Sequence, residues 1–170
     1  MNTTLETGRP LPVLDLVSAT GAETSLAREI AGRIAVVHLM RTSSCPVCLA
    51  HAAALQRMSD DGSLGDALLV LIAPGGAAEA SDAAARAARR SPSATVFASA
   101  SAHAALGLGT VALLQQTATI VVDPAGAVRS VRASTLPTGS FSADEVRAAV
   151  AAASSGEGSV PLRTDGTPGA

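Results

Sequence analysis

The stretch VVHLMRTSSCPVCLAHAAAL, residues 36–55, contains the only two cysteines of the chain, Cys45 and Cys48. An apolar run rich in β-branched residues, 34–40, is typical of a buried strand. Hydroxyl residues follow it as candidate N-caps, and a helical pattern begins at Cys45. Pro46 lies in the first helical turn, where its missing N–H costs no hydrogen bond. The sequence therefore predicts a strand, a loop and a helix, with the cysteine pair at the start of the helix.

On both sides of this unit, strand patterns and helix patterns alternate. Such an order predicts an α/β fold with helices on both faces of a central sheet. We expect that sheet to be mixed and mainly parallel, with an antiparallel edge formed by the last hairpin. The expected elements are a β-hairpin at 12–26, a helical turn at 26–32, strands at 67–73, 94–99, 117–123 and 127–133, and helices at 77–90, at 101–108 and after Ser142.

Composition limits the class of protein. The chain has 170 residues, of which 48% are apolar and 15% charged, as expected for one globular domain. We expect a flexible lead-in at 1–10, the domain at 11–153 and a disordered tail at 154–170. The net charge of -2 gives no electrostatic case for binding nucleic acid or an anionic membrane. No targeting segment or membrane-spanning run is visible, so a cytoplasmic location is expected.

The spacing of the cysteines suggests redox chemistry. Unpaired N–H groups and the helix dipole favour a thiolate on Cys45 at the helix N-terminus. Cys48 lies one turn further on the same face, where it can attack a mixed disulfide or a sulfenic acid on Cys45. A structural zinc site would need a second pair of ligands at suitable spacing, which the sequence lacks. Two inert cysteines remain an alternative, and no cofactor is expected.

The segment 36–55 resembles the active-site segment of the redoxins, the peroxiredoxin-like (alkyl hydroperoxide reductase/thiol-specific antioxidant) branch of the thioredoxin superfamily. Residues 7–26 resemble the N-terminal hairpin of that family, 94–108 its strand and short helix, and 117–131 its closing hairpin. The order of the elements supports the resemblance more than any single motif. It implies a thioredoxin-like fold with an N-terminal β-hairpin and a central mixed sheet.

The resemblance also implies a function. The expected activity is that of a thiol-dependent oxidoreductase that reduces a small hydroperoxide or disulfide through a redox-active disulfide. An external thiol reductant, such as a thioredoxin, would restore the thiols. A homodimer is left open. The alternatives are a thioredoxin-like protein that exchanges disulfides with other proteins, and a non-enzymatic module that binds a metal or an iron–sulfur cluster between two chains.

The peroxidatic pattern of the family, Pro-x-x-x-Thr-x-x-Cys, is matched only in part. Thr42 and Cys45 match it, but His38 stands in place of the proline. Arg41 is a candidate to bind the thiolate or a peroxide oxygen. Thr117 occupies the place where the resemblance implies a peroxide-binding arginine in peroxiredoxins or a cis-proline in thioredoxins. We expect Thr117 to face the cysteine pair and to contact the substrate.

The absence of a proline at this place has a consequence for the substrate. We expect the Gln116–Thr117 bond to be trans, which alters the backbone edge where a peptide would dock and favours a small substrate. The sequence gives little indication of a functional role for any of the three histidines. We interpret His38 as a satisfied core residue and His51 as a solvent-facing residue, and we assign no role to His103.

Overall fold

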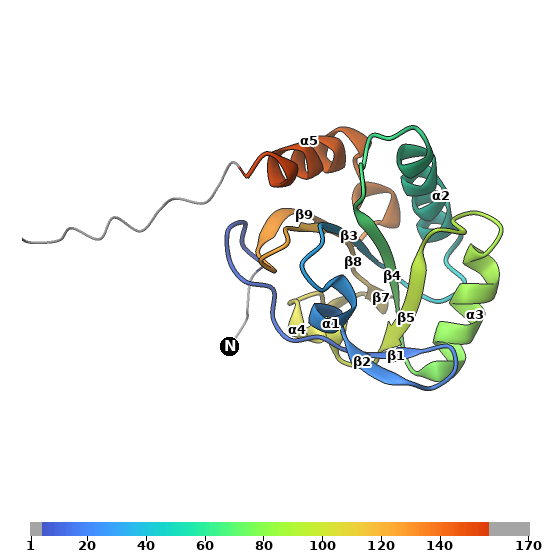
Figure 1. Cartoon of the computed structure of the whole chain (residues 1–170). Helices are drawn as coiled ribbons and strands as arrows, with labels where there is room; N and C mark the ends of the chain where they lie inside the picture. Colours follow the sequence, from blue (N-terminus) through green and yellow to red (C-terminus); the bar gives the residue numbers. More distant parts are fainter. Residues whose placement is uncertain (1–4, 157–170) are drawn as a thin grey trace, which may run out of the picture.

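The computed structural model describes residues 5–156 and has a seven-stranded sheet at its centre (Figure 1). The strand order is β2-β1-β5-β4-β3-β8-β9. Pairs β3–β4 and β4–β5 are parallel, and the other neighbours are antiparallel. The strands are β1 (Asp15–Ser18), β2 (Glu23–Ser25), β3 (Ala35–Leu39), β4 (Leu68–Pro74), β5 (Thr95–Ser99), β8 (Thr117–Val122) and β9 (Val128–Ser134).

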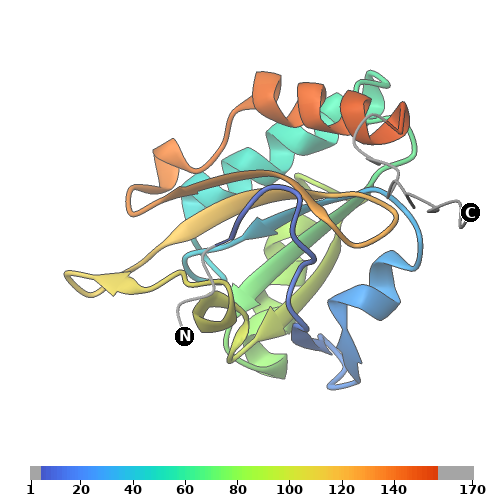
Figure 2. The same ribbon diagram turned by 90° about the vertical axis from the view of Figure 1, so that its left-hand side faces the viewer.

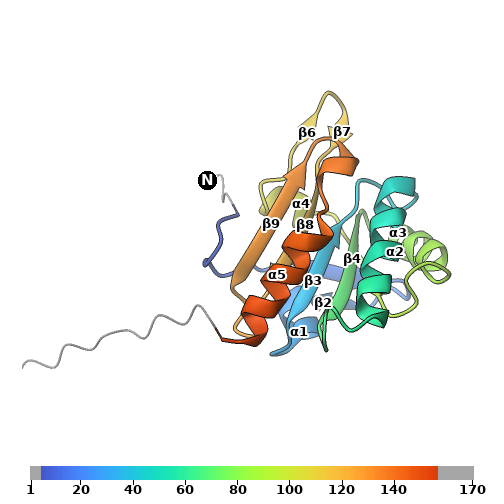
Figure 3. The ribbon, with the colours of Figure 1, turned by 90° about the horizontal axis from the view of Figure 1, so that it is seen from above.

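The helices cover both faces of this sheet, as Figures 1 and 3 show. One face carries α2, α3 and α5, and the other carries α1 and α4. Strand β3 is central and all five of its residues are buried. The helices are α1 (Leu26–Ile30), α2 (Pro46–Asp60), α3 (Ala77–Ala87), α4 (Ala102–Ala105) and α5 (Ala143–Ser154), with a 3-10 turn η1 (Pro137–Gly139) before α5.

The predicted α/β class with a mixed central sheet is confirmed, but the expectation of a mainly parallel sheet was wrong. The chain passes from β5 through α4 and a short hairpin to β8. This connection stays at the end of the sheet where β3 and β5 finish, so β8 runs back antiparallel to β3. The N-terminal strand β1 likewise runs antiparallel to β5.

The connection before β8 contains a hairpin that the sequence analysis missed. It consists of β6 (Thr110–Val111) and β7 (Leu114–Gln115), and it extends from the body of the molecule (Figure 2). Its two turn residues, Ala112 and Leu113, have φ values of 48° and 66°. Two-residue hairpin turns of this kind usually contain Asn-Gly, so an Ala-Leu pair gives no turn signal.

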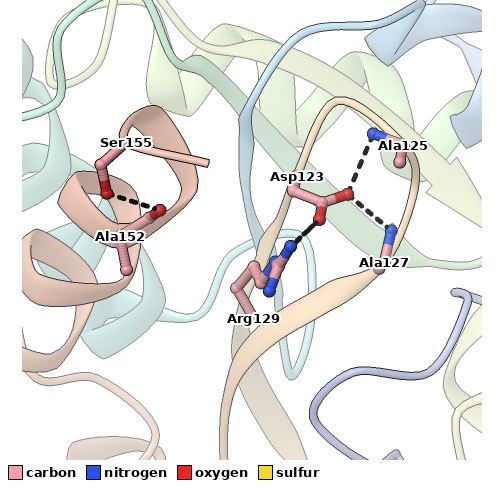
Figure 4. Close-up of polar contacts among 6 residues, drawn as sticks. All are labelled: Asp123, Ala125, Ala127, Arg129, Ala152 and Ser155. Carbon is pink, nitrogen blue, oxygen red and sulfur yellow. Dashed lines mark hydrogen bonds and ion pairs between the residues drawn. The ribbon is translucent and has the colours of Figure 1, made fainter. Parts of the chain in front are cut away.

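The turn between β8 and β9 is held by Asp123, as Figure 4 shows. One carboxylate oxygen accepts hydrogen bonds from the Ala125 and Ala127 amides, each at 2.9 Å. The other oxygen forms a 2.7 Å ion pair with Arg129. The side chain of Asp123 is only 6% exposed, so this network is screened from solvent. It fixes the hairpin whose first strand begins at Thr117.

Residues at the expected boundary of the lead-in contact strand β9. Gly8 donates a backbone hydrogen bond to Val128, and Arg9 accepts one from it, so this part of the expected lead-in is attached to β9. Helix α5 continues to Ser154, and the Ser155 hydroxyl donates to the Ala152 carbonyl (Figure 4). Residues 1–4 and 157–170, which include most of the predicted tail, lie outside the described residues.

Candidate active site

The cysteine pair lies where the central strand β3 passes into α2. Pro46 lies in the first turn of α2, as the sequence predicts, but the N-cap is Cys45 itself and not one of the hydroxyl residues before it. The loop between β3 and α2 is anchored from the side, because the Ser43 hydroxyl donates a 2.7 Å hydrogen bond to Asp82 on α3. This contact joins residues 39 positions apart and has no signal in the sequence. It fixes the loop that carries the first cysteine.

The two thiols are free and in direct contact. Their Sγ atoms lie 2.6 Å apart, and the Cys48 thiol donates to Cys45. The Cys48 backbone N–H also points to the Cys45 sulfur, at 3.3 Å. Cys45 therefore receives two hydrogen bonds at a helix N-terminus, where the dipole adds to their effect on a negative charge. The structure therefore brings the two predicted site cysteines together at the start of α2.

The environments of the two sulfurs differ. Cys45 is 6% exposed and Cys48 is completely buried. Burial, followed by the hydrogen bond to Cys45, raises the pKa of the Cys48 thiol to about 12. The backbone N–H of Arg41 donates to the Cys48 sulfur at 3.4 Å and acts in the opposite direction on that pKa. Cys48 therefore stays protonated at neutral pH, and of the two cysteines only Cys45 is partly exposed.

The other predicted site residues lie around this pair with different contacts from those expected. Arg41 contacts the pair through its backbone amide, and its guanidinium has no hydrogen bond or ion pair within residues 5–156. Thr42 is exposed, and its carbonyl accepts the N–H of Cys45 at 3.3 Å. Thr117 is fully buried, and within the described part of the chain its hydroxyl has no partner. No cis peptide bond occurs there either, so the Gln116–Thr117 bond is trans, as predicted.

Strand register places Thr117 relative to the loop 40–45, which joins β3 to α2. Leu39 pairs with Ala118 in the antiparallel β3–β8 ladder, so Thr117 lies beside Met40, where β3 ends. Alternation along the strand puts Thr117 on the same face as Thr119, which pairs with His38. This is the face covered by α2. The structure therefore brings Thr117 to the start of the loop 40–45, on the side of α2.

Two of the histidines, His38 on β3 and His51 on α2, meet between this strand and this helix. His38 is buried, as expected of a core residue, and its Nδ1 lies 2.9 Å from the hydroxyl of Thr119. Its Nε2 is buried without a hydrogen-bond partner within residues 5–156, so only one of its ring nitrogens is satisfied. The interpretation of His51 as solvent-facing was wrong, because its ring lies edge-on to His38 and stacks on Phe141. Burial lowers the pKa of His38 to about 3 and also lowers that of His51. Both rings are therefore neutral parts of the layer between β3 and α2.

The third histidine, His103 on α4, was assigned no role from the sequence and yet lies next to the loop. Its Nε2 is 2.8 Å from the Met40 carbonyl oxygen. A carbonyl oxygen only accepts hydrogen bonds, so Nε2 carries the proton. Burial lowers the pKa of His103, against the opposing effect of this hydrogen bond. The contact spans 63 positions of sequence, and no local pattern predicts it.

Neither a metal centre nor a membrane span was found within residues 5–156. This part of the chain has no group of three or more His, Cys, Asp or Glu side chains placed to hold a metal ion. Its helices also lack the combination of length and apolar character that a membrane crossing requires.

Comparison with known proteins identifies the family. The redoxin family model matches residues 6–150, which is most of the chain. No significant match was found among curated protein sequences.

Solved structures share the fold at low identity. Peroxidoxin BcpB from Mycobacterium tuberculosis is 19% identical, with a TM-score of 0.67 over 87% of this chain and 97% of that one. Reduced Prx3 from Vibrio vulnificus in complex with hydrogen peroxide is 20% identical, with a TM-score of 0.71 over 86% and 99%. The thiol peroxidase from Chromobacterium violaceum is 14% identical, with a TM-score of 0.72 over 92% and 91%. Together with the family match, these similarities confirm the predicted thioredoxin-like fold, and the chain belongs to the redoxin family.

Proposed function

We propose that the protein is a thiol-dependent peroxidase in which Cys45 attacks the substrate and Cys48 completes the reaction. The observation that carries this proposal is the contact of two free thiols, 2.6 Å apart, at the start of α2. Membership of the redoxin family supports the class of activity. The similar proteins described as peroxidoxin and thiol peroxidase support peroxide as the substrate class.

The proposed first step is attack of the Cys45 thiolate on the O–O bond of a hydroperoxide. The distal oxygen stays on sulfur as a sulfenic acid, and the alkoxide leaves and takes up a proton to become an alcohol. Hydrogen peroxide gives water in the same way. Cys45 suits this role because it is the more exposed of the two cysteines and accepts two hydrogen bonds at the helix N-terminus. The Arg41 guanidinium and the exposed Thr42 hydroxyl are proposed to bind the peroxide oxygens.

The proposed second step closes the disulfide. The Cys48 sulfur attacks the sulfenic sulfur of Cys45, the S–O bond breaks, and hydroxide leaves as water with the proton that Cys48 releases. Two external thiols then reduce the disulfide and are themselves oxidised to one. We propose a cytosolic dithiol protein of the thioredoxin kind as this reductant. Both cysteines belong to one chain, so the cycle needs no second copy.

A second candidate is exchange with a small disulfide. The direct contact of the two thiols favours it, because an adjacent dithiol can reduce a disulfide through a mixed-disulfide intermediate. In this second candidate mechanism, Cys45 attacks a sulfur of the substrate disulfide instead of a peroxide oxygen. Cys48 then closes the Cys45–Cys48 disulfide as in the peroxidase mechanism. The departure at His38 bears on the peroxide step only. The departure at Thr117 bears on both candidates, because this place holds an arginine in peroxiredoxins and a cis-proline in thioredoxins.

One experiment separates the two candidates. Reduced protein is mixed with hydrogen peroxide, an alkyl hydroperoxide, oxidised glutathione or a protein disulfide, and loss of free thiols is followed with time. The peroxidase proposal expects the fastest loss with a hydroperoxide and a sulfenic acid trapped by dimedone on Cys45 in the Cys48→Ser variant. Faster loss with oxidised glutathione, without a trapped sulfenic acid, would overturn it in favour of disulfide exchange.

A further inference from the structure

The end of strand β3 has an unusual hydrogen-bonding gap. In the parallel β3–β4 ladder, Leu39 pairs with Ile72, and the Met40 N–H donates to the Ile72 carbonyl at 2.8 Å. The ladder would continue with an N–H from residue 74 to the Met40 carbonyl. Residue 74 is a proline, which has no N–H to give. The strand therefore leaves a buried carbonyl group without its ladder partner.

His103 fills this gap from the other face of the sheet. Its Nε2–H donates to the Met40 carbonyl at 2.8 Å, and the ring is 5% exposed. Helix α4 is held in place for this contact, because the Ser99 hydroxyl accepts hydrogen bonds from the Ser101 and Ala102 amides. A buried carbonyl that loses its donor costs free energy, so the contact has a structural value of its own.

The same peptide group also contacts the active site. The bond between Met40 and Arg41 is trans, so its carbonyl and its N–H point in opposite directions. The carbonyl accepts from His103, and the Arg41 N–H donates to the Cys48 sulfur at 3.4 Å. A donor on the carbonyl polarises the peptide and strengthens hydrogen bonding by its N–H. One peptide group therefore links a histidine on one face of the sheet to the buried thiol on the other.

We propose that His103 is a positioning residue for Cys48. Through the Met40–Arg41 peptide it aims the Arg41 N–H at the Cys48 sulfur and favours the thiolate that attacks Cys45. This role rests on the proposed function only in that Cys48 acts as the second thiol of the pair. The Arg41 amide is the one contact that assists ionisation of Cys48 from outside the cysteine pair, against burial and the contact with Cys45.

The test uses a small aromatic disulfide, 5,5′-dithiobis(2-nitrobenzoate), which needs no peroxidase activity. Cys45 attacks it and releases one coloured thiolate, leaving a mixed disulfide. Cys48 then attacks the mixed disulfide at the Cys45 sulfur and releases the second coloured thiolate. The two phases report the two cysteines separately. We expect His103→Leu to slow the second phase about 3- to 10-fold, the effect of about one net hydrogen bond, and to leave the first unchanged.

Two further variants distinguish this role from simple packing. His103→Gln keeps a side-chain N–H and should restore much of the second phase. Pro74→Ala in the His103→Leu background supplies the missing backbone N–H and should restore it as well. Thr119→Val is the matched control: it removes the buried bond to His38, which does not lead to Cys48, and should leave both phases unchanged.

The outcomes separate this inference from the proposed function. A normal second phase in His103→Leu would overturn the inference. So would a second phase that stays slow in both His103→Gln and the double variant, although circular dichroism shows that they fold. Two normal phases in the wild-type protein, without thiol loss on addition of any hydroperoxide, would overturn the peroxidase proposal and leave the role of His103 intact.

Discussion

The ring of His38 meets the ring of His51 edge to face, with 5.3 Å between their centroids. This contact lies between the central strand β3 and the active-site helix α2. Burial is the main reason that His38 has a pKa of about 3, and the neighbouring His51 and His103 lower it further. Among the described residues 5–156, a charged imidazolium in this layer would have neither solvent nor a carboxylate partner. The fold therefore requires His38 to be neutral.

We predict that stability falls as the pH falls below 6.5. Unfolded His38 binds a proton near its ordinary pKa of 6.5, whereas the native side chain does so only near 3. Below pH 6.5 the unfolded state thus binds more protons, which lowers the free energy of unfolding. Between about pH 7.5 and about pH 5.5, His38 alone should cost about 1.4 kcal/mol, measured by urea denaturation. His38→Gln should lose less stability over this interval, and an equal loss would contradict the assignment to His38.

Mild oxidation should join Cys45 to Cys48 within one chain. The sulfurs are already in contact, so bond formation requires little movement. Mass spectrometry of a digest should show a loss of two hydrogens within one peptide, reversed by dithiothreitol. Two persistent free thiols, or links only between chains, would refute the prediction.

The two cysteines should behave differently when each is replaced. Cys45→Ser should abolish thiol labelling and activity near neutral pH, because Cys48 is buried and its pKa is about 12. Cys48→Ser should react once and then stop as a sulfenic acid or mixed disulfide. Iodoacetamide labelling and mass spectrometry distinguish these products. If Cys48→Ser lost the first reaction while Cys45→Ser kept it, the two roles would be exchanged.

Protein disulfides should be poor substrates. The trans Gln116–Thr117 bond lacks the backbone geometry that a cis-proline would give to a docked peptide. In an insulin-reduction assay with a dithiol donor, we expect turnover far below that of a thioredoxin measured alongside. Thr117→Pro is the informative variant, since a gain of insulin reduction would assign the low activity to this position. Turnover equal to that of the thioredoxin would remove the preference for a small substrate.

The hairpin turn at Asp123 should be a major contributor to stability. Asp123→Ala removes two amide contacts and leaves the largely buried Arg129 unpaired, which should cost about 2–4 kcal/mol. Asp144 offers a control, because its ion pair with Arg147 involves a side chain that is 95% exposed. Asp144→Ala should cost less than about 1 kcal/mol in the same denaturation experiment. Similar losses in both variants would contradict the importance of burial.

The sequence predicted the elements that have strong local patterns. The buried strand before Cys45, the proline in the first turn of α2 and the Ser142 cap of α5 all follow from periodicity and capping. Strand direction was less predictable, because the alternation of strands and helices does not show at which end of the sheet a connection crosses. The β6–β7 hairpin was missed because Ala112 and Leu113 adopt left-handed conformations that these residue types rarely take.

The candidate site was predictable only where its residues are close in sequence. Cys45 and Cys48 lie one helical turn apart, so their contact follows from spacing. His103 reaches the site through a carbonyl that loses its strand partner because of Pro74. This contact depends on strand register and on the placement of α4, and a local sequence pattern predicts neither of them. His51 was misplaced because an imidazole on a helix suits either solvent or an aromatic neighbour.

The contact between the two thiols has a kinetic consequence. Both sulfurs lie on the first turn of one helix, 2.6 Å apart, so the reduced and oxidised forms can share one backbone conformation. Disulfide closure then requires no helix unwinding and no loop rearrangement, which are microsecond-to-millisecond events in proteins that need them. Turnover should accordingly be limited by encounters with the oxidant and the reductant. Amide hydrogen exchange along α2 should be nearly the same in both redox states.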